Sequence, residues 1–123
     1  MKSTELRLNN WVNCYGINFP VTAINHTHVE GAANDGEFLI SDLQPIPLTF
    51  EILNNSCKSW RTFHDGVIIF EFGIFDFWSQ NGSLWLDREW NSKILPDNIE
   101  SVHQLQNLYY ILMGEELEIK FEK

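Results

Sequence analysis

The clearest pattern of hydrophobic and polar positions lies near the C-terminus, in residues 99–114. Ser101 followed by Gln104 matches a capping box, and Gly114 can adopt the left-handed conformation that often ends a helix. Between them, apolar residues recur every three or four positions, which is typical of a helix with one buried face: Val102, Leu105, Leu108, Tyr109 and Leu112. The sequence therefore predicts a core helix with a defined beginning and end.

The N-terminal part of the chain carries short runs of strand-forming residues between turns rich in Gly and Asn. Asn9 and Asn10 can supply the turn geometry that most residues resist. Pro20 cannot donate to a strand ladder, so we expect it at a sheet edge or at the beginning of its strand. The pattern predicts a small, strongly bent sheet or an SH3-like barrel. Residues 6–12 lead into its first strand, and further strands follow over 19–24, 27–30 and 37–41, with a turn over 31–36.

Two further elements flank the middle of the chain. Thr49 is a good N-cap residue and predicts a short helix over 50–54, where Glu51 would complement the helix dipole. Residues 116–122 alternate polar and apolar side chains without interruption, which predicts a half-buried strand after the core helix.

The second β region is more hydrophobic than the first. Residues 67–72 predict a strand, and we interpret Gly73 as a bulge or bend from which the strand continues over 74–79. Asn81-Gly82 is a strong signal for a two-residue hairpin, with the chain returning over 83–88. The sequence therefore predicts a central hairpin in addition to the N-terminal sheet.

Together these elements predict one α+β domain over residues 1–123. An SH3-like β portion would occupy 1–44; a short helix, a β-hairpin, the core helix and a C-terminal strand would occupy 45–123. We expect the main helix to pack across a bent antiparallel sheet. A chain of 123 residues with 44% hydrophobic residues can bury such a core without a metal or a disulfide.

The formal net charge of −9 limits the classes of partner. The eight basic residues are scattered, so we expect no nucleic-acid binding through a basic patch. An acidic surface could instead repel nucleic acid, attract a basic protein, or simply keep the chain in solution. We expect a protein partner of unknown identity, and a homodimer is one arrangement that the sequence allows.

Cellular location is predicted from features of the whole chain. The N-terminus lacks an apolar stretch typical of a signal peptide, and no apolar run reaches the length of a membrane span. Cys14 and Cys57 show no CxxC or metal-ligand spacing. The sequence allows a disulfide between them, but it favours two buried thiols in a reducing compartment. We therefore expect a cytoplasmic protein.

Three segments carry a family resemblance. Residues 5–12 (ELRLNNWV), 46–53 (IPLTFEIL) and 102–117, which contain VHQLQNLY and GEEL, together cover about a quarter of the chain. In this order they resemble a family of short uncharacterised proteins of gut-type bacteria and their phages or mobile elements. In that family the position of Asn9 is more often Gly, which supports a turn there. The resemblance implies a provenance and a shared fold, and no reaction.

One group of residues could bind a metal ion. His26, His28 and Glu30 occupy positions i, i+2 and i+4, which share one face of a strand, so two imidazoles and a carboxylate could converge. The alternative is an exposed strand face beside an acidic turn. Spacing alone is weak evidence for a metal, so we predict no metal site and no cofactor, with these three residues as the only weak candidate.

The sequence offers two candidates for acid–base or nucleophilic chemistry. His64-Asp65 could form an acid–base pair, but adjacent residues in a turn seldom orient each other, and a solvated turn is favoured. Cys57 could be a nucleophile with His64 or His103 as its base. No hydrolase signature surrounds Cys57, and a structural thiol is favoured. We therefore predict no catalytic residue and no enzyme activity.

A polar stripe runs beside the apolar face of the core helix. It consists of residues at positions i, i+3, i+4 and i+7 that suit hydrogen bonding to a peptide, a partner backbone or a base edge: His103, Gln106, Asn107 and Tyr110. The alternative is that His103, Gln104 and Gln106 cap the helix and bond loop backbone inside the fold. If the protein has a binding site, this stripe is a better candidate than the His26–Glu30 strand.

Aromatic residues complete the list of candidates. A group in the second β region could form a stacking platform, but without basic neighbours a core or a protein–protein surface is favoured: Phe75, Phe77, Trp78, Trp85 and Trp90. We predict a non-enzymatic protein-interaction module of phage or mobile-element origin. A nucleic-acid-associated or nucleic-acid-mimicking acidic protein is the alternative, followed by a small metal-dependent enzyme.

Overall fold

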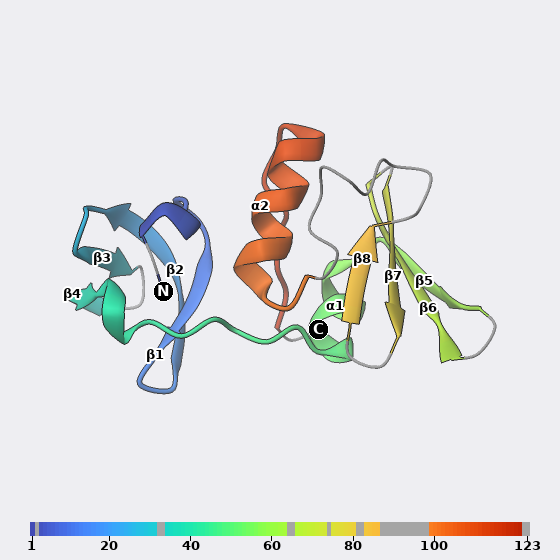
Figure 1. The fold of residues 1–123 in the computed structure, drawn as a ribbon, viewed down its shortest axis with the longest axis horizontal. Coiled ribbons are helices and arrows are strands. Elements are labelled where there is room, and N and C mark those ends of the chain that lie inside the picture. The colour runs from blue at the N-terminus through green and yellow to red at the C-terminus, as the bar shows by residue number, and fades with distance from the viewer. Residues whose placement is uncertain are drawn as a thin grey trace. The chain divides into compact units, whose positions relative to one another are not determined.

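The computed structural model describes residues 1, 3–31, 34–63, 66–73, 75–80, 83–86 and 99–121. The chain divides into two compact units whose segments alternate along the sequence (Figure 1). Unit 1 comprises Met1–Pro47 and Ser101–Glu116, and unit 2 comprises Leu48–Glu100 and Leu117–Lys123. Within the described ranges, no helix is long and apolar enough to cross a membrane. The α+β class is confirmed, whereas a single domain stays a prediction.

Unit 1 is built on an antiparallel sheet with strands in chain order, β1 (Trp11–Cys14), β2 (Ile17–Ile24), β3 (His28–Gly31) and β4 (Asn34–Leu39). The first half of β2 pairs with β1 and the second half pairs with β3. This change of partner along one strand gives the bent antiparallel sheet that the sequence predicts. Two short 3₁₀ helices, η1 (Ser3–Glu5) and η2 (Ile40–Asp42), flank it.

The turn residues explain the ends of these strands. Asn9 has φ 74°, which confirms the expected left-handed turn. Pro20 lies opposite Trp11 in the half of β2 that has not yet met β3, so its missing N–H leaves no gap in the ladder. The predicted turn over 31–36 is wrong in extent, because Gly31 already pairs with Asn34, the first residue of β4. Residues 32 and 33 lie outside the described ranges.

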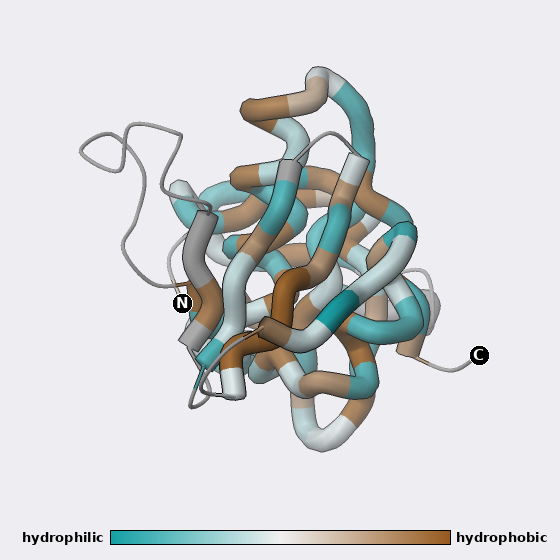
Figure 2. Tube along the Cα trace, turned by 90° about the vertical axis from the view of Figure 1, so that its right-hand side faces the viewer, coloured by the Kyte–Doolittle hydropathy of each residue, from teal (hydrophilic) through white to brown (hydrophobic). Residues whose placement is uncertain are grey.

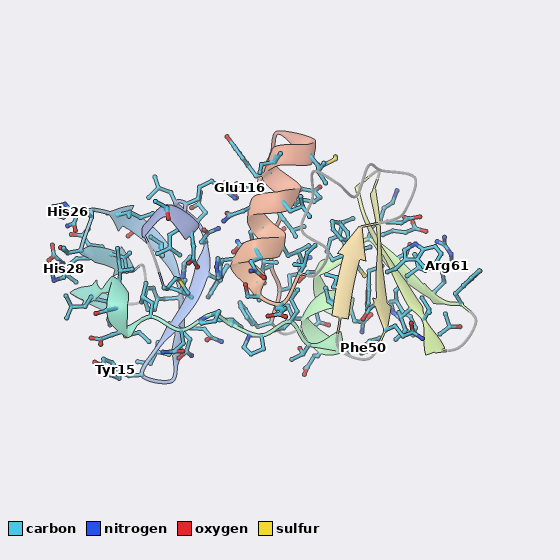
Figure 3. The ribbon with its side chains drawn as sticks, in the orientation of Figure 1. Tyr15, His26, His28, Phe50, Arg61 and Glu116 are labelled. Atoms are coloured by element: carbon cyan, nitrogen blue, oxygen red, sulfur yellow. The ribbon has the colours of Figure 1, made fainter. Side chains whose placement is uncertain are left out.

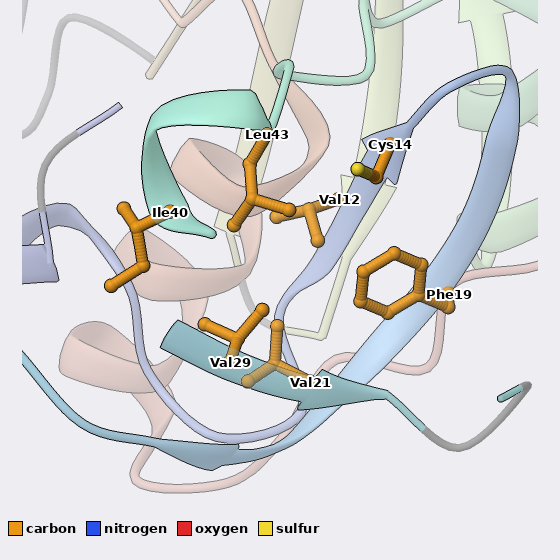
Figure 4. Close-up of a cluster of buried hydrophobic side chains, with 7 residues drawn as sticks. All are labelled: Val12, Cys14, Phe19, Val21, Val29, Ile40 and Leu43. Atoms are coloured by element: carbon orange, nitrogen blue, oxygen red, sulfur yellow. The ribbon is translucent and has the colours of Figure 1, made fainter. Parts of the chain in front are cut away.

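The core of this sheet is a cluster of seven buried side chains (Figure 4): Val12, Cys14, Phe19, Val21, Val29, Ile40 and Leu43. Phe19 is the largest of them, and its ring stacks on Phe38 with the centroids 4.7 Å apart. The same ring lies directly over Gly31, so a Cβ at that position would come within 2.8 Å of its Cε2 atom. Glycine is therefore required at Gly31 for packing.

The main helix, α2 (Val102–Met113), belongs to unit 1 and packs against β1. Ser101 and Gln104 form the predicted capping box, and Gly114 ends the helix with φ 72°. The apolar stripe is buried at all but its last position, where Leu112 is only half-buried. The prediction of a capped core helix is confirmed.

Unit 2 contains α1 (Phe50–Ser56) and a second antiparallel sheet, with strands β5 (Ser59–Thr62), β6 (Ile68–Phe72), β7 (Phe75–Gln80) and β8 (Ser83–Leu86) in chain order. Hydrophobic and hydrophilic positions are mixed along the strands that face the viewer in Figure 2. The side chains of Phe70, Phe72 and Phe77 are at most 1% exposed and form the core of this sheet. The predicted short helix is confirmed and is two residues longer at its end than the expected 50–54.

One prediction in the second β region needs correction. Gly73, with φ 63°, is not a bulge within one long strand: it turns the chain back, and Phe72 pairs with Phe75 across the resulting hairpin. The reason is that a left-handed glycine supports a tight reversal as readily as a bend. The predicted hairpin at Asn81-Gly82 is confirmed by the pairing of Gln80 with Ser83, and residues 81–82 and 87–88 lie outside the described ranges. Strand β5 is an element that the sequence did not predict.

The predicted C-terminal strand is also wrong. Leu117 and Ile119 are buried and their neighbours are exposed, as the alternation indicates, but residues 117–121 join no sheet. Instead, the backbone N–H of Lys120 donates to Oγ of Ser56 at the end of α1, with 2.9 Å between the atoms. The alternating burial therefore occurs without a strand ladder, in a segment that hydrogen-bonds to the end of α1.

Candidate interaction surface

Helix α1 holds a large aromatic side chain at the surface of unit 2. Thr49 is its N-cap, with Oγ1 accepting a hydrogen bond from the backbone N–H of Ile52 at 3.2 Å. This fixes the first turn and thereby Phe50, whose residue surface is 46% exposed. Its ring meets Trp60 edge-on, with centroids 5.2 Å apart, and lies 5.8 Å from the ring of Phe70. Phe50 therefore links the buried core to the surface.

Strand β5 lies at one edge of the same sheet, and all four of its residues are exposed. Successive side chains of a strand point to opposite faces, so Trp60 and Thr62 lie on the face that α1 covers. Arg61 lies on the other face and forms ion pairs with Glu71 at 2.7 Å and Asp76 at 3.6 Å. Figure 3 labels Phe50 and Arg61 on these two elements.

A second aromatic pair follows β5. Phe63 is 50% exposed, and its ring lies 5.6 Å from that of Trp78. The indole Nε1 of Trp78 is buried and has no hydrogen-bond partner among the residues that the structure describes, which is uncommon for a tryptophan. Exposed aromatic residues therefore lie on both faces of the sheet beside β5. We call Phe50, Trp60 and Phe63 the aromatic surface of unit 2.

A cleft of 210 Å³ opens next to Phe50. Its walls come from the first turn of α1 and from the ends of β6, β7 and β8, and they are largely apolar: Leu48, Thr49, Phe50, Leu53, Gly66, Ile68, Phe70, Ser79, Gln80 and Leu84. A cleft of this size can hold an apolar side chain of a partner.

The edges of the two sheets differ in how they are covered. In unit 1, the side-chain amide of Gln106 accepts from the backbone N–H of Trp11 at 2.8 Å and donates to the carbonyl of Asn9 at 3.0 Å. Gln44 and Asn13 exchange two backbone hydrogen bonds further along β1. In unit 2, the N–H of Ile99 donates to Leu84 of β8. The outer side of β5 pairs with no residue that the structure describes.

The predicted polar stripe faces the N-terminal segment of unit 1. Gln106 is 2% exposed and holds the backbone before β1 as described above. Oδ1 of Asn107 accepts from Nδ2 of Asn10 at 2.8 Å and from Nε of Arg7 at 3.2 Å, and its Nδ2 donates to the carbonyl of Glu5 at 3.0 Å. Gln106 thus bonds backbone inside the fold, as the alternative interpretation expects of it. Asn107 bonds backbone and side chains there as well.

The other two residues of the stripe differ in exposure. Tyr110 is 42% exposed, and the guanidinium of Arg7 lies 4.3 Å above its ring while forming an ion pair with Glu116. His103 is 4% exposed, with Nδ1 3.2 Å from Oγ of Ser101 and Nε2 3.9 Å from the carboxylate of Glu5. Burial lowers the pKa of His103, and the Glu5 carboxylate opposes this shift. In this stripe, Tyr110 retains a large exposed surface.

The weak metal candidate is not assembled in the structure. His26 lies in the turn before β3, so the strand periodicity does not extend to it. Oδ1 of Asn25 shapes this turn by accepting from the backbone N–H groups of Thr27 and His28. Both histidines lie at one end of the sheet in Figure 3. Over the described ranges, no three His, Cys, Asp or Glu side chains are placed to hold a metal ion.

The remaining candidates have separate environments. Both cysteines are free thiols, Cys14 buried and Cys57 half-buried, and burial raises the pKa of each thiol and so disfavours the reactive thiolate. His64-Asp65 lies outside the described residues. Of the predicted aromatic group, Phe77 is a core residue, Trp78 is half-buried, and the side chains of Phe75, Trp85 and Trp90 lie outside the description.

The aromatic surface was not predicted from the sequence because β5 was not predicted. A signal was present: Trp60, Thr62 and Phe63 are all residue types with high β propensity, in a segment for which no element was predicted. Phe50 was identified only as the first residue of a helix. Its neighbour Trp60 lies ten positions away, and no local pattern connects a helix start with a strand on the same face.

Comparison with known proteins adds no assignment: no family model, no curated protein and no solved structure matches the chain. The geometry of the described residues is therefore the basis for a functional proposal. Its most distinctive feature is an open strand edge flanked by exposed aromatic side chains.

Proposed function

We propose that the chain is a non-enzymatic protein-interaction module that binds a protein partner through the aromatic surface of unit 2. The observation that carries this proposal is the exposure of Phe50, Trp60 and Phe63 around one edge strand. Aromatic residues are enriched at protein interfaces, and tryptophan is prominent among the residues that contribute most binding energy.

The packing around this surface supports the same conclusion. Phe50 is held in place by the capped first turn of α1 and by Trp60 and Phe70, so little side-chain entropy remains to be lost on binding. The cleft beside it offers a site for an apolar side chain of the partner. Rigid aromatic walls next to a small cleft are the usual arrangement of a binding hot spot.

Provenance and location are part of the proposal. The resemblance of three segments to short proteins of gut-type bacteria and their mobile elements supports a phage or mobile-element origin, and we propose action in the cytoplasm. The net charge of −9 favours partners that are neutral or basic over acidic ones.

The proposal is tested by selection of short, unstructured peptides from a randomised display library on the intact chain. We expect peptides whose affinity falls at least tenfold for Trp60→Ala and Phe50→Ala, since each removes an exposed aromatic contact. The matched control is Tyr15→Asn, which removes an exposed aromatic residue from unit 1 at a position of positive φ that suits Asn. Dispersed NMR spectra of the variants show that each remains folded.

Two results would contradict the proposal. One is a library from which no peptide binds the chain with measurable affinity. The other is a set of peptides whose affinity depends on Tyr15 and not on Trp60 or Phe50. Either result would remove the aromatic surface of unit 2 as an interaction site.

A further inference from the structure

We infer that the partner binds as an added β-strand: an extended, neutral or basic segment of a different polypeptide pairs with the outer side of β5. This inference rests on the proposed function and specifies how the partner is held. Backbone hydrogen bonds would supply affinity, and alternate side chains of the added segment would supply specificity.

The register of β5 determines which backbone groups are available. Ser59, Arg61 and Phe63 lie opposite Glu71, Ile69 and Val67, and the N–H of Phe63 donates to the carbonyl of Val67 at 2.7 Å. In an antiparallel pair, hydrogen-bonded and non-hydrogen-bonded pairs alternate. Arg61 is therefore bonded toward β6, whereas the N–H and C=O groups of Trp60 and Thr62 point to the outer side, ready for another strand.

The other sheet edges are less suited to strand addition. Gln106 and Gln44 cover β1, and Ile99 bonds to β8. The outer side of β4 also pairs with no described residue, but this strand contains Asp35, Gly36 and Glu37, and charged residues and glycine are typical means by which edges avoid association. On β5, the charge of Arg61 is already paired with carboxylates on its own face.

The side chains beside β5 indicate what the added segment carries. Trp60 and Thr62 lie on the face of α1, where Phe50 extends the apolar surface. Side chains of the added strand that point to this face would lie next to Trp60, within the range of cross-strand contacts. We expect them to be apolar, with polar or basic residues at the alternate positions.

Charge argues against a second copy of this chain as the occupant. Two copies would each bring a net charge of −9. A basic segment is attracted by the same net charge, so the partner is a different polypeptide.

The test compares two proline variants. Proline removes a backbone N–H, and at Thr62 this group points away from β6, so Thr62→Pro leaves the β5–β6 ladder intact. Glu37→Pro is the matched control on β4. The N–H of Ile40 bonds to the carbonyl of Thr27 across the β3–β4 pair, and bonded and non-bonded positions alternate along a strand. The N–H of Glu37, three positions before Ile40, therefore points to the outer side of β4. With the peptides selected as above, Thr62→Pro should lower affinity at least tenfold and Glu37→Pro should leave it unchanged.

A second measurement uses the unsubstituted chain. On saturation with a selected peptide, the amide protons of Trp60 and Thr62 should exchange with solvent at least tenfold more slowly, because they gain hydrogen bonds. This readout decides the inference even if the proline variant does not fold. Unchanged exchange at both amides would overturn strand addition.

The outcomes separate the inference from the proposed function. If Trp60→Ala abolishes binding and Thr62→Pro does not, side chains alone hold the partner: strand addition is overturned and the interaction module stands. If neither variant weakens binding, both the inference of strand addition and the proposed function are contradicted. A dimer of the unsubstituted chain that Thr62→Pro converts to a monomer would overturn the choice of a different polypeptide as the occupant.

Discussion

The side-chain amide of Asn10 donates a hydrogen bond to Oδ1 of Asn107, with 2.8 Å between the two atoms, although the residues lie 97 positions apart. Asn10 is 0% exposed, and its own Oδ1 accepts from the backbone N–H of Arg7 at 2.7 Å. This pair connects the turn before β1 to α2. It thus holds together the two separate stretches of unit 1.

Replacement of Asn107 tests this connection. Asn107→Ala leaves the buried Nδ2 of Asn10 without its acceptor, so we expect the free energy of unfolding to fall by about 1–3 kcal/mol. Urea unfolding followed by circular dichroism measures the change. Ile111→Ala, at a 75% exposed position of the same helix, serves as control and should stay within about 0.5 kcal/mol of the parent. Equal effects of the two substitutions would contradict a structural role for Asn107.

Gly31 provides a second test, of packing. In Gly31→Ala the new Cβ would collide with the ring of Phe19, a core residue that is 1% exposed, so we expect a loss of about 1–3 kcal/mol in the free energy of unfolding. The double variant Gly31→Ala with Phe19→Leu should be more stable than the sum of the two single changes predicts, because the smaller side chain vacates the space. Strict additivity in thermal unfolding would show that the two residues do not clash.

His103 should make stability depend on pH. Burial holds the pKa of folded His103 below its ordinary value of 6.5; the amino group of Met1 adds to this shift and Glu5 opposes it. The unfolded chain therefore takes up a proton at a higher pH than the folded chain. The contribution of His103 to the free energy of unfolding is therefore fully present above pH 6.5. It decreases as the pH drops below 6.5 and stops decreasing below the pKa of the folded state.

The matched variant for this effect is His103→Gln, which cannot titrate in that range. Other groups titrate in both proteins, so the relevant quantity is the difference between their free energies of unfolding across the pH range. We expect the parent to lose stability relative to His103→Gln as the solution is acidified below pH 6.5. A difference that does not change with pH, or a parent that gains relative stability in acid, would be incompatible with a lowered pKa.

The N-cap of α1 links stability to the aromatic surface. Thr49→Ala removes the acceptor of the Ile52 N–H and should cost about 1 kcal/mol. Thr49→Ser retains a hydroxyl and should recover most of this loss. Because the cap fixes the turn that carries Phe50, Thr49→Ala should also weaken the binding of selected peptides. Full affinity of a destabilised Thr49→Ala variant would show that the position of Phe50 does not depend on the cap.

Local signals predicted the helices well. The limits of α2 follow from Ser101, Gln104 and Gly114, and the start of α1 follows from Thr49, because each cap acts within one helical turn of its own residue. The apolar stripe of α2 likewise follows from its period. Asn9 was identified as a turn residue because few residue types other than Gly tolerate positive φ.

Long-range pairing explains what the sequence could not show. At Gly73 the chain can either reverse, so that β7 pairs with β6, or bend and continue as one long strand. The sequence of the turn allows both, and the structure shows the reversal. The hydrogen-bond partners of Gln106 and Asn107 lie in the N-terminal segment, far away in the chain. From the sequence alone, the side chains of Gln106 and Asn107 were therefore interpreted as part of a polar stripe available for binding. The aromatic surface needs both α1 and β5, and only the fold brings Phe50 to Trp60.

Unit 1 is assembled from two stretches that are separated by residues 48–100. During translation, β1 to β4 therefore leave the ribosome well before Gln106 and Asn107. Until then the nascent sheet lacks the Gln106 contacts on the backbone beside β1 and the Asn107 acceptor for the amide of Asn10. A message that ends before codon 101 would yield a polypeptide trapped at this stage, open to chaperones and proteases. Synthesis of α2 thus has to precede the covering of this sheet edge by Gln106.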